Sequence, residues 1–410
     1  MKKLPKSLLT LSMMLAIAPT YVAAQSIAII NAKVHTATEQ GVLNNATVVF
    51  NEGKIVAINP AQVNADKTID ANGKVLTPGF ISTMNAVGLV EVSQAKATRD
   101  TVDEAIDMTF DASLAFNPKT TAIPLARKGG LTTSVITANG GETIYAGQTF
   151  TAKMTGEWDS VVSTHGALYV ELGMSHDGSR GISMQTLIRE LEDAHKKLTA
   201  KEDDEEEPSR ESLIINAVLA GEKTLIVYAD RASDILHLLE LKKQYDIDLV
   251  LIDAADAVIV AEQIAQAKVP VVMDSMRNLP ESFDSLHNHL SNAAKLTQAG
   301  VQVVLTTSGG AHTVYGLRYA VGNAVANGMD YNAAMKSVTS NAASVFKIDA
   351  GSIAVGKPAD IVLWNGDPFE YSTQVDTMWI DGEQQSTESR HDKLRDRYMK
   401  QSTMPAAYTR

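Results

Sequence analysis

Short, almost continuously apolar runs recur through the second half of the 410-residue chain, and a segment with helical spacing follows each of them. Strands that are apolar along their whole length are buried on both faces, as in parallel sheets covered by helices. The alternation of such strands with helices therefore predicts an α/β fold with a parallel sheet. The runs are Thr224–Tyr228, Asp248–Ile252, Val269–Met273 and Val301–Leu305.

The first half supplies further strands for the same architecture. The stretch Val75–Leu89 passes through the step Pro78-Gly79 and is the expected first strand, and Leu131–Thr137 and Ala167–Leu172 follow it. We predict a TIM-type (β/α)8 barrel over residues 78–350, with its active site at the carboxyl ends of the strands. Helices are predicted at 119–128, 184–198, 258–267, 286–299, 319–327 and 332–346.

The two ends of the chain have strand-and-turn patterns instead. Residues 26–77 contain short apolar strands separated by tight turns such as Asn51-Glu52-Gly53-Lys54. Residues 351–385 begin with Gly351–Trp364, a G-x-I-x-x-G-x-x-A-D run followed by an apolar strand. Residues 386–410 are polar and are expected to form a tail or a surface helix.

These patterns resemble the amidohydrolase superfamily, in particular its imidazolonepropionase-like, cyclic-amidase-like members. The matching segments are the Pro78-Gly79 step with its strand, Ala229–Ile235 and Gly351–Trp364, and the resemblance covers nearly all of residues 26–385. It implies a barrel with a small β-sandwich domain built from both chain ends, 26–77 plus 351–385. It also implies hydrolysis of C–N bonds in cyclic amides or small peptides by a metal-activated water.

At the positions where that family holds its metal, this sequence has other residues. The family's paired histidines and the aspartate before them are replaced by Met84, Ala86 and Ser82. A later histidine is replaced by Asp253, and the aspartate of the last strand by Thr307. No metal is therefore expected at the usual positions. The candidates for a catalytic role at the barrel mouth are Glu171, Tyr228, Asp230, Asp253, Asp274 and Thr307.

The remaining histidines leave a relocated metal site as an alternative. His176 and His312 each follow a barrel strand, and His287-Asn288-His289 opens a predicted helix. Together His176, His287, His289 and His312 would satisfy the ligand count of a zinc site. In a helix, however, residues two positions apart point to different sides.

Charged residues at the strand ends allow two interpretations. Asp230, Asp253 and Asp274 could bind a cationic substrate, with Arg277 and Arg318 as further mouth residues. Alternatively, the acids pair with Arg231 and Arg277 in internal salt bridges, which is the interpretation that we favour.

Composition limits the partners and the compartment. A formal net charge of -12 argues against nucleic acid or an anionic membrane as the partner. Residues 1–24 have the basic start, short apolar stretch and small residues of a secretory signal, with cleavage expected between Ala24 and Gln25. The mature protein is thus predicted to be periplasmic or secreted and not membrane-bound. The acidic run 202–207 is expected to be a solvated loop.

Two functions from different classes follow. The first is a secreted amidohydrolase acting on the C–N bond of a small-molecule substrate. The second is a catalytically inactive relative that binds a ligand, or that acts as the partner of a homologous amidohydrolase subunit.

Overall fold

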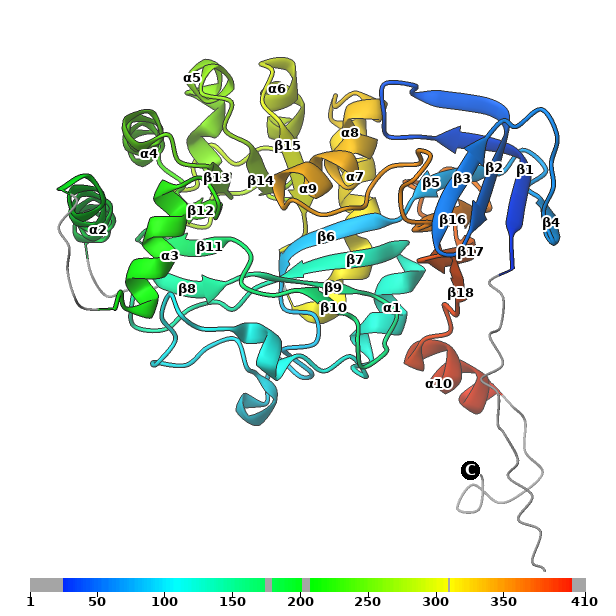
Figure 1. Cartoon of the computed structure of the whole chain (residues 1–410), viewed down its shortest axis with the longest axis horizontal. Coiled ribbons are helices and arrows are strands. Elements are labelled where there is room, and N and C mark those ends of the chain that lie inside the picture. The colour runs from blue at the N-terminus through cyan, green and yellow to red at the C-terminus, as the bar shows by residue number, and fades with distance from the viewer. Residues whose placement is uncertain (1–24, 174–178, 201–206, 309, 400–410) are drawn as a thin grey trace, which may run out of the picture.

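The computed structural model describes residues 25–173, 179–200, 207–308 and 310–399. The predicted signal of residues 1–24 and all but Glu207 of the acidic run lie outside these ranges. The described strands form three sheets, of eight, four and six strands, and Figure 1 shows the eight-stranded sheet at one end of the molecule. Among the described residues there is no helix that is both long and apolar enough to cross a membrane.

The eight-stranded sheet combines the two ends of the chain, which agrees with part of the predicted β-sandwich domain, although its strands form a single hydrogen-bonded sheet. Its central contact is the antiparallel pairing of β5 with β16, in which Thr77 lies opposite Val362. The hydrogen bonds connect all of its strands in one sheet, in the order β18-β17-β16-β5-β1-β2-β3 with β4 beside β1. The strands are β1 (Ile27–His35), β2 (Val42–Asn51), β3 (Lys54–Ile58), β4 (Lys67–Asp70), β5 (Val75–Pro78), β16 (Ile361–Trp364), β17 (Val375–Ile380) and β18 (Glu383–Gln385).

Trp364 attaches this sheet to the rest of the molecule. Its ring is fully buried, stacks on Phe80 at a centroid distance of 5.4 Å, and donates a hydrogen bond from Nε1 to Thr77 Oγ1 (2.9 Å). Gly130 leaves room for the ring, because a Cβ at this position would lie 2.3 Å from Trp364 Cη2. The apolar strand of the 351–364 signature therefore serves the junction between the sheets as well as its own sheet.

A buried ion pair makes a second attachment. Lys153 Nζ lies 2.5 Å from Asp360 Oδ2 and 3.1 Å from Asp381 Oδ1. The other oxygen of Asp360 accepts the backbone N–H of Asp381 at 2.8 Å. Both oxygens of a carboxylate that is 2% exposed are thus satisfied, as burial of a charge requires.

The strands predicted for the barrel are divided between the other two sheets. The four-stranded sheet has the order β10-β9-β7-β6, and the six-stranded sheet has the order β15-β14-β13-β12-β11-β8. β6 and β7 run parallel, as do β11 to β15. The strands are β6 (Phe80–Asn85), β7 (Leu131–Ile136), β8 (Tyr145–Gln148), β9 (Phe150–Lys153), β10 (Val161–Ser163), β11 (Leu168–Glu171), β12 (Leu225–Tyr228), β13 (Leu249–Ile252), β14 (Val271–Asp274) and β15 (Val303–Thr306).

Two connections bring these sheets together. β8 and β9 are separated by Thr149 alone, and β8 pairs antiparallel with β11 while β9 pairs antiparallel with β7. At the other side, Thr306 Oγ1 donates a hydrogen bond to the carbonyl of Thr83, which joins β15 to β6 (2.5 Å). The sequence analysis placed no strand between Leu131–Thr137 and Ala167–Leu172, so the antiparallel strands in this region were not predicted.

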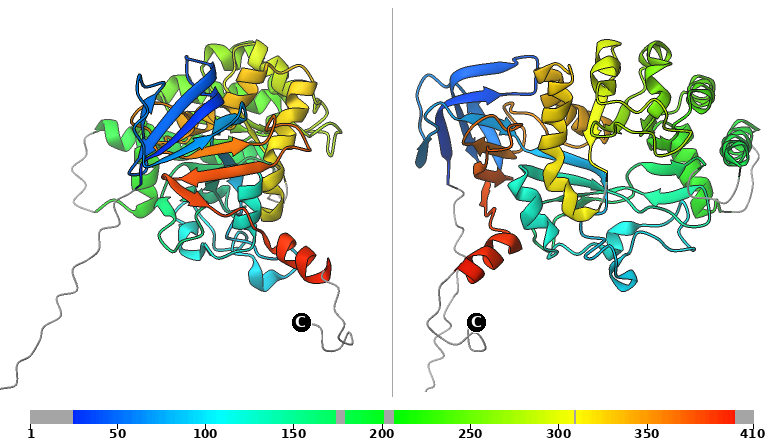
Figure 2. Two further views of the ribbon diagram at one scale, coloured as in Figure 1. Left: turned by 90° about the vertical axis from the view of Figure 1, so that its right-hand side faces the viewer. Right: turned by 180° about the vertical axis from the view of Figure 1, so that it is seen from behind.

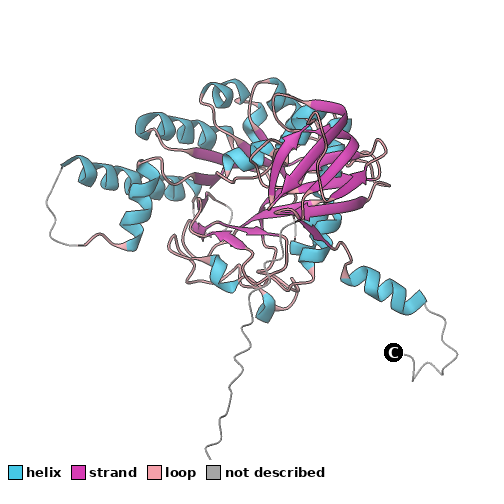
Figure 3. Ribbon diagram, turned by 45° about the vertical axis from the view of Figure 1, so that its right-hand side comes forward, coloured by secondary structure: helices cyan, strands magenta, loops and turns pink. Residues whose placement is uncertain are grey.

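Helices lie on the outside of the strands, as the cyan and magenta ribbons of Figure 3 show, and Figure 1 shows α4, α5 and α6 following one another beside β12 to β15. Their apolar faces, such as Ile235, Leu238 and Leu239 in α4, are buried. The helices are α1 (Ala122–Lys128), α2 (Arg180–Ala200), α3 (Arg210–Leu219), α4 (Ala232–Tyr245), α5 (Ala261–Gln266), α6 (Asn292–Gln298), α7 (Leu317–Ala326), α8 (Tyr331–Ser337), α9 (Ser340–Val345) and α10 (Arg390–Met399).

Several predicted boundaries were wrong. Val75–Leu89 is not one strand, because it divides at Gly79 into β5 of the terminal sheet and β6. The predicted helix 332–346 divides into α8 and α9, and the Oγ1 atom of Thr339 between them bonds back to the carbonyl of Met335. The polar C-terminal segment forms α10, which projects from the molecule in both views of Figure 2.

Candidate active site at the carboxyl edge

The parallel strands β11 to β14 end at one edge of the six-stranded sheet, and ionisable side chains gather there. Alternation along a strand places Tyr169 and Glu171 on one face of β11, and Tyr228 and Asp230 on one face at the end of β12. Several of these groups influence one another's pKa. We call the set the carboxyl-edge cluster: Tyr169, Glu171, Tyr228, Asp230, Asp253, Asp274 and Arg277.

Asp253 is the centre of this cluster. It follows β13 directly, donates its backbone N–H to the carbonyl of Val272 (2.9 Å), and has a left-handed backbone with φ of 65°. Ala254 is also left-handed, with φ of 48°, so the chain turns sharply after the strand. Such strain in residues other than glycine is uncommon and is concentrated at functional sites.

The charge of Asp253 is balanced by one arginine. Its Oδ2 atom lies 3.1 Å from Arg277 Nη2, and only 14% of its side chain is exposed. Burial raises the pKa of Asp253 to about 6; Arg277 opposes this shift, and the charges of Asp230 and Asp274 add to it. Asp253 can therefore accept and release a proton near neutral pH.

Two tyrosines supply hydroxyl groups beside the acids. Tyr228 Oη donates to Asp230 Oδ2 at 2.7 Å, and Tyr169 is hydrogen-bonded to Glu171. Burial and then the neighbouring carboxylates raise the pKa of both tyrosines, so both remain protonated donors. Burial likewise raises the pKa of Asp230.

The other predicted acid and threonine have local roles. Asp274 accepts backbone N–H groups on both oxygens, from Met276 and from Ser308, each at 2.8 Å. It therefore fixes the loops that follow β14 and β15. Thr306 rather than Thr307 makes the side-chain contact to β6. Ser308 was not predicted, and it also accepts a hydrogen bond from Arg277 Nε at 3.3 Å.

The positions of the family's first-strand ligands carry no equivalent chemistry. Met84 is left-handed (φ 51°), and Ala86 offers no ligand atom. Ser82 belongs instead to a buried network, with its Oγ 2.9 Å from Ser134 Oγ and 3.3 Å from Asn85 Nδ2. Ser134 and Asn85 were not singled out in the sequence, because each is unremarkable until the strands pair.

The histidines are placed apart. Residues 287 and 289 precede α6, which begins only at Asn292, so their expected position in a helix was wrong. His287 Nδ1 is 2.6 Å from Asp256 Oδ1, whereas His289 Nδ1 is 2.8 Å from Ser291 Oγ. His312 lies in the η4 turn (Ala311–Gly316), and His176 falls outside the described residues. Within the described ranges, there is no group of three or more His, Cys, Asp or Glu residues that could hold a metal.

The donor set at the carboxyl edge does not fit the metal centre that the family implies. Both oxygens of Asp230 are occupied, by Tyr228 Oη and by the N–H of Ala255, and both oxygens of Asp274 are occupied by N–H groups. Asp253 is paired with a guanidinium, which places a positive charge of the protein itself in the cluster. A cation here would have to displace these internal partners.

The arginines are divided between salt bridges and structural contacts. The expected pairing of a strand-end acid with Arg277 is observed, since Arg277 contacts Asp253, whereas Arg231 contacts Asp284, an acid that was not among those predicted. The prediction that Arg318 faces the mouth was wrong. Arg318 is buried in α7 and donates to the carbonyls of Pro368, Glu370 and Thr373, which its position after the last barrel strand did not indicate.

Comparison with known proteins agrees with this fold. The sequence profile of the Amidohydrolase family matches residues 209–385, whereas no curated protein matches. The structure of an amidohydrolase from Thermotoga maritima MSB8 superposes with a TM-score of 0.78 at 23% identity, covering 87% of this chain and 99% of that one. At this identity the likeness concerns the fold.

Two more distant structures have the same fold. One is a beta-aspartyl dipeptidase from Fervidobacterium islandicum AW-1, with a TM-score of 0.57, 16% identity, and coverage of 89% of this chain and 98% of that one. The other is molinate hydrolase, with a TM-score of 0.57, 15% identity, and coverage of 90% and 96%. The chain is therefore similar to the Amidohydrolase family over residues 209–385, and it shares the α/β fold of solved amidohydrolase structures.

Proposed function

We propose that this chain hydrolyses the C–N bond of a small substrate, a cyclic amide or a short peptide, at the carboxyl-edge cluster and without the family's metal centre. The similarity to the Amidohydrolase family supports the reaction class. The observation that carries the proposal is Asp253, a nearly buried carboxylate at a strand end with a raised pKa and an arginine partner.

The groups of the cluster suffice for a metal-free hydrolysis. Asp253 takes one proton from a water molecule, and the water oxygen attacks the carbonyl carbon of the amide. Arg277 is the donor for the oxygen that becomes negatively charged, while Tyr228 keeps its hydrogen bond to Asp230. Arg277 has capacity for this, because within the described chain its Nη1 atom has no recorded hydrogen bond. When the C–N bond breaks, Asp253 returns its proton to the leaving nitrogen.

The second candidate is a ligand-binding or partner-subunit role without turnover. It is favoured by the replacement of family ligand positions by Met84, Ala86, Asp253 and Thr307. A homologous subunit with an intact centre would then supply the chemistry.

The test compares Asp253→Asn with wild type on a panel of dipeptides and cyclic amides. Wild type is expected to turn over at least one class, and the variant to lose at least about a hundredfold in kcat. Asp246→Asn is the matched control, because Asp246 is exposed and its left-handed backbone accepts asparagine.

Chelator and elemental analysis complete the test. Unchanged turnover in chelator, with no bound zinc, supports the metal-free reaction. Loss of turnover in chelator that zinc restores would contradict it. Absence of turnover across the panel, with a ligand still bound, would favour the second candidate.

Two structural expectations belong to the same proposal. We propose that β6, β7, the β8–β9 segment and β11 to β15 close into one barrel, with an antiparallel segment in place of one parallel strand; the pairings of β8 and β9 and the Thr306–Thr83 hydrogen bond support this. We also propose export with cleavage before Gln25. Mass spectrometry of the mature N-terminus tests the cleavage site.

A further inference from the structure

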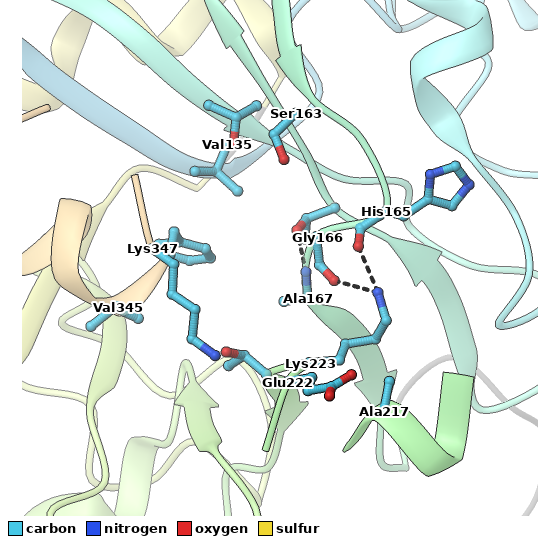
Figure 4. A pocket seen from close by; sticks show the side chains of 14 residues that line it. Val135, Ser163, His165, Gly166, Ala167, Ala217, Glu222, Lys223, Val345 and Lys347 are labelled. Carbon is cyan, nitrogen blue, oxygen red and sulfur yellow. Dashed lines mark hydrogen bonds between the residues drawn. The ribbon is translucent and has the colours of Figure 1, made fainter. Parts of the chain in front are cut away.

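A cavity of about 340 Å³ lies at the opposite, amino end of the same parallel strands. It is bounded by β9, by the residues that precede β11 and β12, and by the segment after α9. Figure 4 shows Lys223 and Lys347 reaching into it from different sides, with Val135 and Val345 on its walls. The proposed reaction uses none of these residues.

Lys223 is a cation without an anionic hydrogen-bond partner in this cavity. Its Nζ atom donates to Gln148 Oε1 (2.8 Å) and to the carbonyls of His165 (2.6 Å) and Gly166 (2.8 Å), which are all neutral oxygens. Burial lowers the pKa of Lys223 to about 8. A partly buried ammonium that lacks a counter-charge is costly, and a bound anion would remove that cost.

The backbone is shaped to hold this lysine. His165 has a left-handed conformation with φ of 52°, and its carbonyl faces Lys223 while its ring points away from the cavity (Figure 4). The His165 ring interacts instead with Thr164 Oγ1 and Asp111. The imidazole is therefore not a ligand group of this cavity.

The other charges of the cavity are balanced or lie at its exposed rim. Lys347 Nζ pairs with Asp248 Oδ2 at 3.0 Å, and Thr224 Oγ1 donates to the same carboxylate at 2.7 Å. Glu222 is exposed, and no ion pair joins it to Lys223 in the described structure. Lys223 is therefore the group that would attract a negative ligand.

Hydroxyl donors and apolar walls complete the site. Thr149 Oγ1 accepts the N–H of Ala167 at 2.9 Å, so its own proton is available, and Thr151 and Ser163 add further hydroxyls. Val135, Val345 and Phe346 provide apolar surface. The three N–H groups of Lys223 are used by neutral oxygens, so an oxyanion would accept hydrogen bonds from the free hydroxyls and be attracted by the Lys223 charge. An apolar body would pack on the remaining wall.

We propose that this cavity is a binding site for a small organic acid, whose carboxylate accepts hydrogen bonds from the threonine hydroxyls and is attracted by the positive charge of Lys223. The site is separate from the carboxyl-edge cluster, and the proposal of this binding site does not depend on whether the chain catalyses hydrolysis.

Butyrate and its neutral analogue butyramide test the proposal by ligand-detected NMR titration of the full mature chain. Wild type is expected to bind butyrate at least about tenfold more tightly than butyramide, because the attraction between the carboxylate and the Lys223 charge is lost with the amide. Lys223→Met is expected to abolish this difference, and Lys243→Met, a change at an exposed lysine of α4, to leave it intact.

Two further variants keep the test decisive if Lys223→Met does not fold, as judged by circular dichroism. Lys223→Arg keeps the charge and is expected to retain the preference for butyrate. Thr151→Val removes one hydroxyl and is expected to weaken butyrate binding about three- to tenfold. Equal binding of butyrate and butyramide by wild type, or an undiminished preference in Lys223→Met, would overturn the proposal.

Discussion

Two buried ion pairs of this molecule have the same chemistry but different surroundings. Lys153–Asp360 joins β9 to the terminal sheet, and its side chains are 10% and 2% exposed. Arg277–Asp253 lies at the carboxyl edge, and its side chains are 27% and 14% exposed. The first pair is enclosed, whereas the second retains access to solvent.

The enclosed pair is also the more completely hydrogen-bonded of the two. Both oxygens of Asp360 are used, by Lys153 and by the N–H of Asp381, so the pair holds two parts of the fold together. Arg277 reaches Asp253 and Ser308 and keeps donor capacity. The enclosed pair therefore links two parts of the fold, and the pair at the carboxyl edge is the one that the proposed reaction uses.

The largest expected effect comes from breaking the enclosed pair. Asp360→Ala should lower the free energy of unfolding by about 3–5 kcal/mol, because it leaves Lys153 charged and buried without its main partner. Urea unfolding followed by circular dichroism measures this. The double variant Lys153→Met, Asp360→Leu should recover part of the loss, since apolar replacements remove the unpaired charge. A loss below about 1 kcal/mol would show that the pair is unimportant.

The Arg277–Asp253 pair should make the free energy of unfolding depend on pH. The folded-state pKa of Asp253, about 6, lies above the value of about 3.9 for an unfolded aspartate. Between these values the folded state keeps a proton that the unfolded state has released, so rising pH destabilises the fold. Relative to Asp253→Asn, wild type should lose about 2–3 kcal/mol of unfolding free energy as pH rises from about 4 to about 7. If the free energies of unfolding of the two proteins change with pH in parallel, the raised pKa of Asp253 is contradicted.

The sequence predicted more of the fold than of the site, and the reason lies in what each needs. The strands around Leu225–Tyr228 and Leu249–Ile252 depend on apolar runs, and these can be recognised without knowing their neighbours. The antiparallel β8 and β9 could not be predicted, because only their partners β11 and β7 distinguish a strand from a glycine-bearing loop.

The site depends on pairings between distant residues. The sequence placed Asp253 at a strand end, but its pairing with Arg277 rather than Arg231 depends on how the loop after β14 returns. Arg318 was misplaced for the same reason, since its carbonyl partners lie 50 to 55 residues away. The histidines were likewise grouped by count, and of these His287 and His289 have different partners in the structure, Asp256 and Ser291.

Removing Arg277 tests whether it controls the pKa of Asp253 at the carboxyl edge. Arg277 lowers the pKa of Asp253, so Arg277→Met should move the ionisation of Asp253 upward by about one pH unit or more. In the proposed reaction the acidic limb of kcat/KM would shift to higher pH by the same amount. The pH series of unfolding experiments provides a readout that does not require turnover. Arg277→Lys keeps the charge and should return the pH midpoint of Asp253 ionisation most of the way to its wild-type value. An unshifted midpoint in Arg277→Met would exclude coupling between the two groups.

The smallest effect is expected at the surface pair Lys74–Asp376. Its atoms are 2.9 Å apart, closer than those of Arg277 and Asp253, but the side chains are 37% and 38% exposed. Solvent screens such a pair, so Asp376→Ala should change the free energy of unfolding by less than about 1 kcal/mol. Urea unfolding at low and high salt measures this, and salt should reduce even this difference. A loss comparable to that of Asp360→Ala would show that distance, and not burial, sets the contribution of an ion pair in this protein.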